Sequence, residues 1–160
     1  MGDASGSGRT ITYRDDARIT AQEAIALYNA STLGERRPVD RPDIFERMLA
    51  NSDILLTAWD GARLVGVSRT ITDYAYAAYL SDLAVDEAYQ RQGIGKRLIE
   101  ETRKRLPPEC MLVLLAAPKA NEYYAKLGFE HNPRAWLIKR AGLAENMPSM
   151  PGIFSGEGRG

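Results

Sequence analysis

The sequence predicts an α+β domain with a mixed β-sheet, and three observations lead to this fold class. The chain has 160 residues, 44% of them hydrophobic and 26% charged, which suits one globular domain with its own core. Two helix-like segments come early and are followed by three consecutive strand-like segments. After these, helical and strand-like patterns alternate. The resulting order is strand, two helices, three strands, helix, strand, helix and strand.

The first half of the chain holds the early helices and a hairpin. Thr20 can cap a helix because Glu23 follows three residues later, as in a capping box. Asp60 and Gly61 tolerate positive φ angles and predict a tight turn between two strands. The expected elements are a strand over 11–14, a helix from Thr20, a loop over 34–42, a helix over 43–50, and strands over 54–59 and 64–71.

The second half contains a long amphipathic helical pattern. Pro107 and Pro108 end it, because proline cannot continue a helix. The nearly continuous apolar run over 111–116 suits a central strand that is buried on both sides. The expected elements are a strand over 75–85, helices over 93–106 and 121–127, a strand over 111–116, and a final strand or strand pair over 129–130 and 135–139.

Both ends of the chain lack periodic patterns. Residues 1–10 predict a flexible leader and residues 141–160 a flexible tail, which leaves a single domain over 11–140. The leader has no apolar core and so does not resemble a secretory signal. No apolar run approaches the roughly 20 residues that span a bilayer, so no membrane partner is expected.

Charge and composition argue against several other classes of protein. The 21 basic and 21 acidic residues cancel, and nucleic-acid binders usually carry a basic excess. Cys110 is the single cysteine, so no internal disulfide can form, which fits a cytoplasmic location. His131 is the single histidine, and no Cys-x-x-Cys pair is present, so no metal site is expected.

A glycine-containing loop before the long helix is the most informative stretch. Gly93, Ile94 and Gly95 open the helix, and Arg91 and Lys96 add positive charge beside it. Glycines let the backbone approach a phosphate closely, and the first N–H groups of a helix have no partners within the helix. The loop therefore predicts a site for a phosphorylated ligand.

Two common phosphate motifs fail on specific residues. The dinucleotide fingerprint needs a third glycine where this chain has Leu98. The nucleotide P-loop needs glycine at the position of Gln90 and serine or threonine at that of Arg97.

The loop matches a third pattern, because Gln90-x-x-Gly93-x-Gly95 has the Q/R-x-x-G-x-G/A form of the GCN5-related N-acetyltransferases (GNAT). Residues 79–86 look like the fourth strand of that family. Residues 123–129 resemble its Y-x-K-x-G-F segment, at the expected distance downstream. The resemblance covers about residues 10–140. It implies a mostly antiparallel mixed sheet with helices on both faces, splayed between strands four and five.

The resemblance also implies acetyl-CoA (coenzyme A) as the cofactor. Its pantetheine arm would pair with backbone in the splay, and its pyrophosphate would lie on the glycine loop. The implied contacts are Leu83, Ala84, Val85, Gln90, Arg91, Gln92, Gly93, Ile94, Gly95, Lys96 and Tyr124. One departure is Ala117, which stands where many relatives carry an asparagine that contacts coenzyme A.

Catalysis requires an acid and a base. The family's general acid falls on Tyr124, whose alternative interpretation is a packed aromatic with a satisfied hydroxyl. Tyr123 should point elsewhere and form core or the acceptor-pocket wall. An alkylammonium acceptor has a pKa of about 10.4 and must lose a proton before attack. Asp82 is the first candidate base, with Asp73 and Glu122 weaker; alternatively Asp82 caps a loop or pairs with Arg69.

The predicted reaction is direct acetyl transfer, in a ternary complex, to a primary amine of a small molecule or a peptide. A non-catalytic acyl-CoA sensor on the same fold is the alternative. Arg36, Arg37 and Arg41 form either a solvated loop or a lid that recognises a carboxylate or phosphate on the acceptor. A homodimer is compatible with the sequence, which does not identify the acceptor.

Overall fold

The computed structural model describes residues 8–143. Of the predicted leader and tail, residues 1–7 and 144–160 lie outside the described residues.

A five-stranded sheet in the order β1-β2-β3-β4-β5 forms the centre of the molecule. The first four strands are antiparallel, and β4 and β5 run parallel. This confirms the predicted mixed, mostly antiparallel sheet. The bounds are Ile11–Arg14 for β1, Ile54–Asp60 for β2, Arg63–Thr72 for β3, Ala77–Val85 for β4 and Met111–Val113 for β5.

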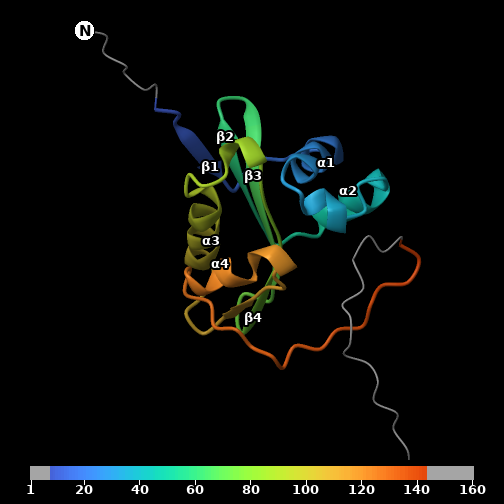
Figure 1. Cartoon of the computed structure of the whole chain (residues 1–160), viewed down its shortest axis with the longest axis vertical. Helices are drawn as coiled ribbons and strands as arrows, with labels where there is room; N and C mark the ends of the chain where they lie inside the picture. Colours follow the sequence, from blue (N-terminus) through green and yellow to red (C-terminus); the bar gives the residue numbers. More distant parts are fainter. Residues whose placement is uncertain (1–7, 144–160) are drawn as a thin grey trace, which may run out of the picture.

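Helices cover both faces of the sheet, as expected (Figure 1). On one side lie α1 (Ala21–Ala30) and α2 (Pro42–Ala50), joined through the short 3-10 helix η1 (Leu33–Arg36). On the other side lies α3 (Ile94–Lys104). The short helix α4 (Asn121–Ala125) lies close to the N-terminal part of α3. The predicted capping box opens α1: Glu23 N–H donates to the Thr20 hydroxyl at 3.1 Å, and Thr20 N–H donates to the Glu23 carboxylate at 2.8 Å.

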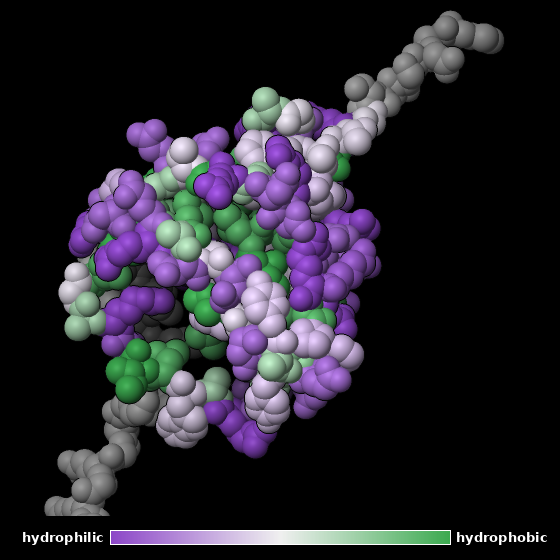
Figure 2. Space-filling view, turned by 180° about the vertical axis from the view of Figure 1, so that it is seen from behind, coloured by the Kyte–Doolittle hydropathy of each residue, from purple (hydrophilic) through white to green (hydrophobic). Residues whose placement is uncertain are grey.

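Each face of the sheet has its own core. Tyr28 of α1 and Phe45 of α2 are fully buried against one face, with ring centroids 5.2 Å apart in an edge-to-face arrangement. Ile94 and Leu98 of α3 are buried against the other face, where Leu56 of β2 belongs to the same cluster. Figure 2 shows one outer face of the molecule, on which hydrophilic residues cover most of the surface and some apolar residues are exposed.

The sheet opens between β4 and β5. Their ladder contains three pairs and ends where Tyr79 faces Val113. A bulge lies just beyond, because β3 places Arg69 opposite Asp82 and Thr70 opposite Leu80, leaving Ser81 without a cross-strand partner. The predicted splay between strands four and five is therefore confirmed.

Two predictions for the C-terminal half are wrong. The run over 111–116 is not a central buried strand: β5 ends at Val113, stands at the sheet edge and exposes 61% of Met111. The final strand or strand pair expected over 129–130 and 135–139 is absent, and this stretch runs as irregular chain (Figure 1). Within residues 8–143 no strand pairs with this stretch, and Ile138 is fully exposed.

Candidate active site

The expected cofactor contacts on β4 lie on a strand edge that is free. Because the ladder with β5 stops at Tyr79, no strand among residues 8–143 pairs with this edge of β4 further along. Ala84 is buried in the α1 core, whereas Leu83 and Val85 are half-buried and pack against the α3 core. A free strand edge offers N–H and carbonyl groups to an extended ligand, as a neighbouring strand would. These residues fit the arm of coenzyme A.

The loop after β4 turns the chain sharply into α3. The Gln90 side chain donates from Nε2 to the carbonyl oxygen of Val85 at 3.0 Å, which ties the loop to the end of β4. Arg91 and Gly93 have φ angles of 62° and 83°, in the left-handed region that favours glycine. An arginine held there is strained, and such strain is often kept at functional backbone.

The start of α3 suits an anion. No side chain caps Gly93, and the first turn contains no acidic residue. The leading N–H groups therefore lack partners within the helix, and the helix dipole adds about half a positive charge. Ile94 is buried and anchors the helix, whereas Gln92 and Lys96 are exposed beside it. The loop fits the pyrophosphate of coenzyme A.

Tyr123 lies against this loop, which the sequence interpretation missed. A Cβ added at Gly95 would lie 3.3 Å from the Tyr123 hydroxyl and 3.8–3.9 Å from Val85 and Leu83. The side chain is 40% exposed, so Tyr123 is not a core residue. Glycine at position 95 allows α4 to approach α3 closely here, and no motif in the sequence signals this contact.

Tyr124 is half-buried beside Tyr123 and Phe129, with ring centroids 5.3 and 5.6 Å away. Its hydroxyl makes no hydrogen bond to another residue within 8–143, so the interpretation of a satisfied, packed aromatic is not supported. Burial raises the pKa of Tyr124, the nearby Tyr123 raises it further, and the charge of Arg36 opposes both. Tyr124 therefore stays protonated near neutral pH, and its proton is available to donate.

Asp82 lies at the centre of a cluster that joins β4 to α1, to β3 and to the end of η1. Its carboxylate accepts hydrogen bonds from Arg37 Nε at 2.6 Å, Arg69 Nε at 2.6 Å and the Tyr28 hydroxyl at 2.8 Å. Burial alone would raise the pKa of Asp82, but the charges of Arg37 and Arg69 and these hydrogen bonds outweigh it and hold the pKa below its usual range. The pairing with Arg69, the alternative drawn from the sequence, is present.

The same two arginines hold the bulge. Arg37 Nη2 donates to the carbonyl oxygen of Ser81 at 2.7 Å, and Arg69 Nη2 donates to its hydroxyl at 2.9 Å. They thus satisfy polar groups of a residue that has no cross-strand partner in β3. Arg37 is 45 positions from Asp82 and Tyr28 is 54, so sequence spacing gives no sign of the cluster.

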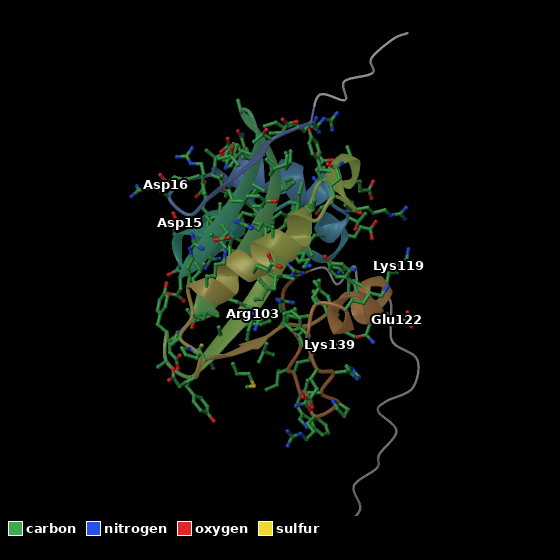
Figure 3. All side chains as sticks on the ribbon, turned by 90° about the vertical axis from the view of Figure 1, so that its left-hand side faces the viewer. Asp15, Asp16, Arg103, Lys119, Glu122 and Lys139 are labelled. Atoms are coloured by element: carbon green, nitrogen blue, oxygen red, sulfur yellow. The ribbon has the colours of Figure 1, made fainter. Side chains whose placement is uncertain are left out.

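The weaker base candidates lie elsewhere. The Asp73 carboxylate accepts N–H groups of Ala75, Tyr76 and Ala77 in the turn before β4, at the opposite end of that strand from the glycine loop. Glu122 lies on the outer side of α4 and is exposed (Figure 3).

Residues 8–143 contain no group of three or more His, Cys, Asp or Glu side chains that could hold a metal ion. Within the same range, no helix is both long and apolar enough to cross a membrane.

The family model described as "Acetyltransferase (GNAT) domain" matches residues 29–140. "Histone acetyltransferase TAP1" of Glycine max is 40% identical over 73 residues, which is 44% of this chain and 32% of that protein. The chain therefore spans about a third of the length of this curated relative.

Solved structures share the fold. A GNAT family acetyltransferase from Streptococcus pneumoniae is 26% identical with a TM-score of 0.66, over 82% of this chain and 100% of the other. The Escherichia coli GNAT family N-acetyltransferase YhbS, solved in complex with CoA, is 23% identical with a TM-score of 0.59, over 75% of this chain and 68% of that one.

Proposed function

Since the chain belongs to the GNAT family of acetyltransferases, we propose that it transfers an acetyl group from acetyl-CoA directly to a primary amine. The observation that carries this proposal is the continuity of two features. The free edge of β4 ends at Val85, and the left-handed turn that opens α3 begins within six residues, at Arg91. An extended amide-containing arm and an attached pyrophosphate need these two surfaces side by side.

In this proposal, backbone groups of Leu83, Ala84 and Val85 pair with the pantetheine amides. Backbone N–H groups between Arg91 and Lys96 hold the pyrophosphate. Gln90 acts indirectly, because its side chain is bonded to the Val85 carbonyl oxygen and fixes the loop.

Bound acetyl-CoA supplies an acetyl thioester. During transfer the bond between carbonyl carbon and sulfur breaks, a bond to the amine nitrogen forms, the amine loses a proton and the departing sulfur gains one. Tyr124 suits the second proton transfer, because burial keeps its hydroxyl protonated. For the first, Asp82 is a weak acceptor, because its paired carboxylate has a lowered pKa. A water chain leading from the amine to solvent is the simpler route.

The remaining features stay predictions from the sequence. They are a small-molecule or peptide amine as acceptor, a cytoplasmic location, a single domain over 11–140, a homodimer, and the absence of nucleic-acid and membrane partners.

The test combines cofactor binding with thiol release. We expect calorimetry to detect acetyl-CoA binding, and Gly93→Val to weaken it about tenfold or more, because valine is strained at a φ of 83° and the loop must move. Gly61→Val is the matched control: Gly61 also has a positive φ and open space around it, but lies in the β2–β3 turn. Equal affinity of the two variants would remove the loop from the cofactor site.

Thiol detection with a panel of primary amines then separates enzyme from sensor. We expect release of free CoA that depends on the amine. Tight binding with no release beyond the amine-free rate, for any amine, would favour the non-catalytic sensor.

A further inference from the structure

Arg37 fastens the 3-10 helix η1 to the bulged part of β4. Besides its bonds to Asp82 and Ser81, its Nη1 donates to the carbonyl oxygen of Arg36 at 2.8 Å. The bulged part of β4 and the backbone of η1 are thereby held by one guanidinium. The backbone at Arg36 is consequently held next to the bulge of β4 by partly buried hydrogen bonds, so it does not belong to a fully solvated loop.

Arg36 differs from the nearby Arg37 and Arg41 because it forms no ion pair with an acidic side chain among residues 8–143. Arg37 pairs with Asp82, and Arg41 pairs with Asp43 at 2.8 Å. The Arg36 side chain is half-buried, yet makes no ion pair or hydrogen bond with any residue in the range 8–143. A guanidinium has five donors in a planar fork, and leaving it partly buried without an acceptor is costly.

The charge around Arg36 is also unbalanced. Arg37 and Arg69 share the single carboxylate of Asp82, so that cluster keeps one excess positive charge. Arg36 adds a second, and its charge reaches the Tyr124 hydroxyl, whose pKa it lowers against the effect of burial. A positive region therefore extends from the bulge of β4 to the proposed general acid.

We propose that Arg36 binds an anionic group, a carboxylate or a phosphate, carried by the amine acceptor. The proposal rests on the acetyl transfer proposed above and names the class of its substrate: an amine with an acidic group at the other end. A bidentate contact between the Arg36 guanidinium and the anion would orient the acceptor so that its amine points toward Tyr124. The same positive region would disfavour diamines and polyamines, whose second cationic end would meet Arg36.

The experiment compares matched acceptors and matched variants. Short ω-amino acids and ω-aminoalkyl phosphates are assayed against their neutral amides and alcohols, in which the amine is unchanged. The variants are Arg36→Ala, Arg36→Lys and the control Arg41→Ala, which removes an equal charge from the exposed pair with Asp43. Arg36→Ala should fold normally, because Arg37 binds the backbone carbonyl of residue 36 and not its side chain.

We expect the wild type and Arg41→Ala to prefer the acidic member of at least one pair in kcat/KM. Arg36→Ala should lose that preference by about 10- to 100-fold, mainly through KM, and Arg36→Lys should keep part of it. Acetyl-CoA affinity should stay as in the wild type, because Arg36 is proposed to contact the acceptor and not the cofactor. The carboxylate and phosphate series identify which anion is bound.

Two results would overturn the proposal while leaving acetyl transfer intact: acidic amines acetylated no faster than neutral ones, or an unchanged preference in Arg36→Ala. Weaker acetyl-CoA binding by Arg36→Ala would place the arginine on the cofactor and would also overturn it. Failure of the wild type to bind acetyl-CoA, or to release CoA with every amine, would instead remove the proposed function itself.

Discussion

An aspartate such as Asp82 can serve either as a general base that takes a proton or as an anion that holds positively charged side chains in position. A free carboxylate on β4 would suit a general base, because it lies one residue before the proposed cofactor contacts. The carboxylate is instead 1% exposed and saturated by Arg37, Arg69 and Tyr28. At the residue scale these contacts favour a positioning role, in which Asp82 holds the bulge and η1 and does not take the proton of the amine.

Asp82→Asn distinguishes the two roles. We expect a loss of about 3 kcal/mol in the free energy of unfolding, because the buried Arg69 and the partly buried Arg37 lose their shared anion. The paired carboxylate has a lowered pKa, so its contribution is present above the unfolded-state pKa of about 3.9 and disappears as the pH falls through the folded-state pKa. Urea unfolding at neutral and acidic pH should show the gap to the wild type closing on acidification.

Kinetics of the same variant provide the decisive measurement. A positioning role predicts a higher KM for the acceptor and an unchanged shape of the kcat profile around neutral pH. A fall in kcat of about 100-fold or more with an unchanged KM, and loss of the acid limb, would establish Asp82 as the base.

Tyr124→Phe tests the general acid. We expect kcat to fall by about 100-fold or more with little change in acetyl-CoA affinity, because the ring contacts with Tyr123 and Phe129 remain and only the proton donor is lost. Tyr76→Phe is the control, since Tyr76 is 76% exposed at the other end of β4. Steady-state kinetics and calorimetry measure both quantities, and an unaltered kcat would exclude the acid role.

At the scale of elements, η1 depends on close packing against α1. A Cβ at Gly34 would collide with the Asn29 side chain and lie 3.1 Å from its backbone. We expect Gly34→Ala to push η1 outward, lower the free energy of unfolding by about 1–3 kcal/mol and raise the acceptor KM, with acetyl-CoA affinity retained. Gly8→Ala is the control, because its Cβ would meet nothing within 4 Å. Unchanged acceptor kinetics in a destabilised Gly34→Ala would separate η1 from the acceptor site.

Local signals explain which elements could be predicted. The β2–β3 hairpin depends on the turn residues Asp60 and Gly61, and the α1 cap depends on Thr20 and Glu23, so neighbours in the sequence determine both. The position of β5 depends on distant partners. An apolar run has the same composition at the edge of a sheet as in its centre, so Met111 and its neighbours could not reveal that β5 is an edge strand.

The residues of the candidate site also fall into two groups, those that the sequence could locate and those that it could not. The loop around Gly93 carries its chemistry in consecutive residues and could be located from the sequence. The Asp82 cluster and the contact of Tyr123 with Gly95 join residues brought together only by folding. Long-range contacts of this kind leave no periodic pattern, so sequence reasoning could offer only an unresolved choice for Asp82 and missed Tyr123.

At the scale of the whole molecule, large apolar side chains are exposed in the C-terminal half. On and just after β5 they are Met111, Val113 and Leu115, and further along they are Trp136, Leu137 and Ile138. Within the described residues, the outer edge of β5 has no partner strand. Exposed apolar surface and an unpaired strand edge both favour association between chains.

We therefore expect the protein to self-associate, with Ile138 in the contact because it is 100% exposed. Ile138→Lys should weaken the association about tenfold or more, since a charge would have to be buried against apolar side chains. Sedimentation velocity over a range of concentrations measures the effect. Ala50→Lys at the exposed end of α2 is the control, because it adds the same single positive charge. A wild type that stays monomeric at every concentration would contradict the prediction and indicate that residues 135–139 are covered by their own chain.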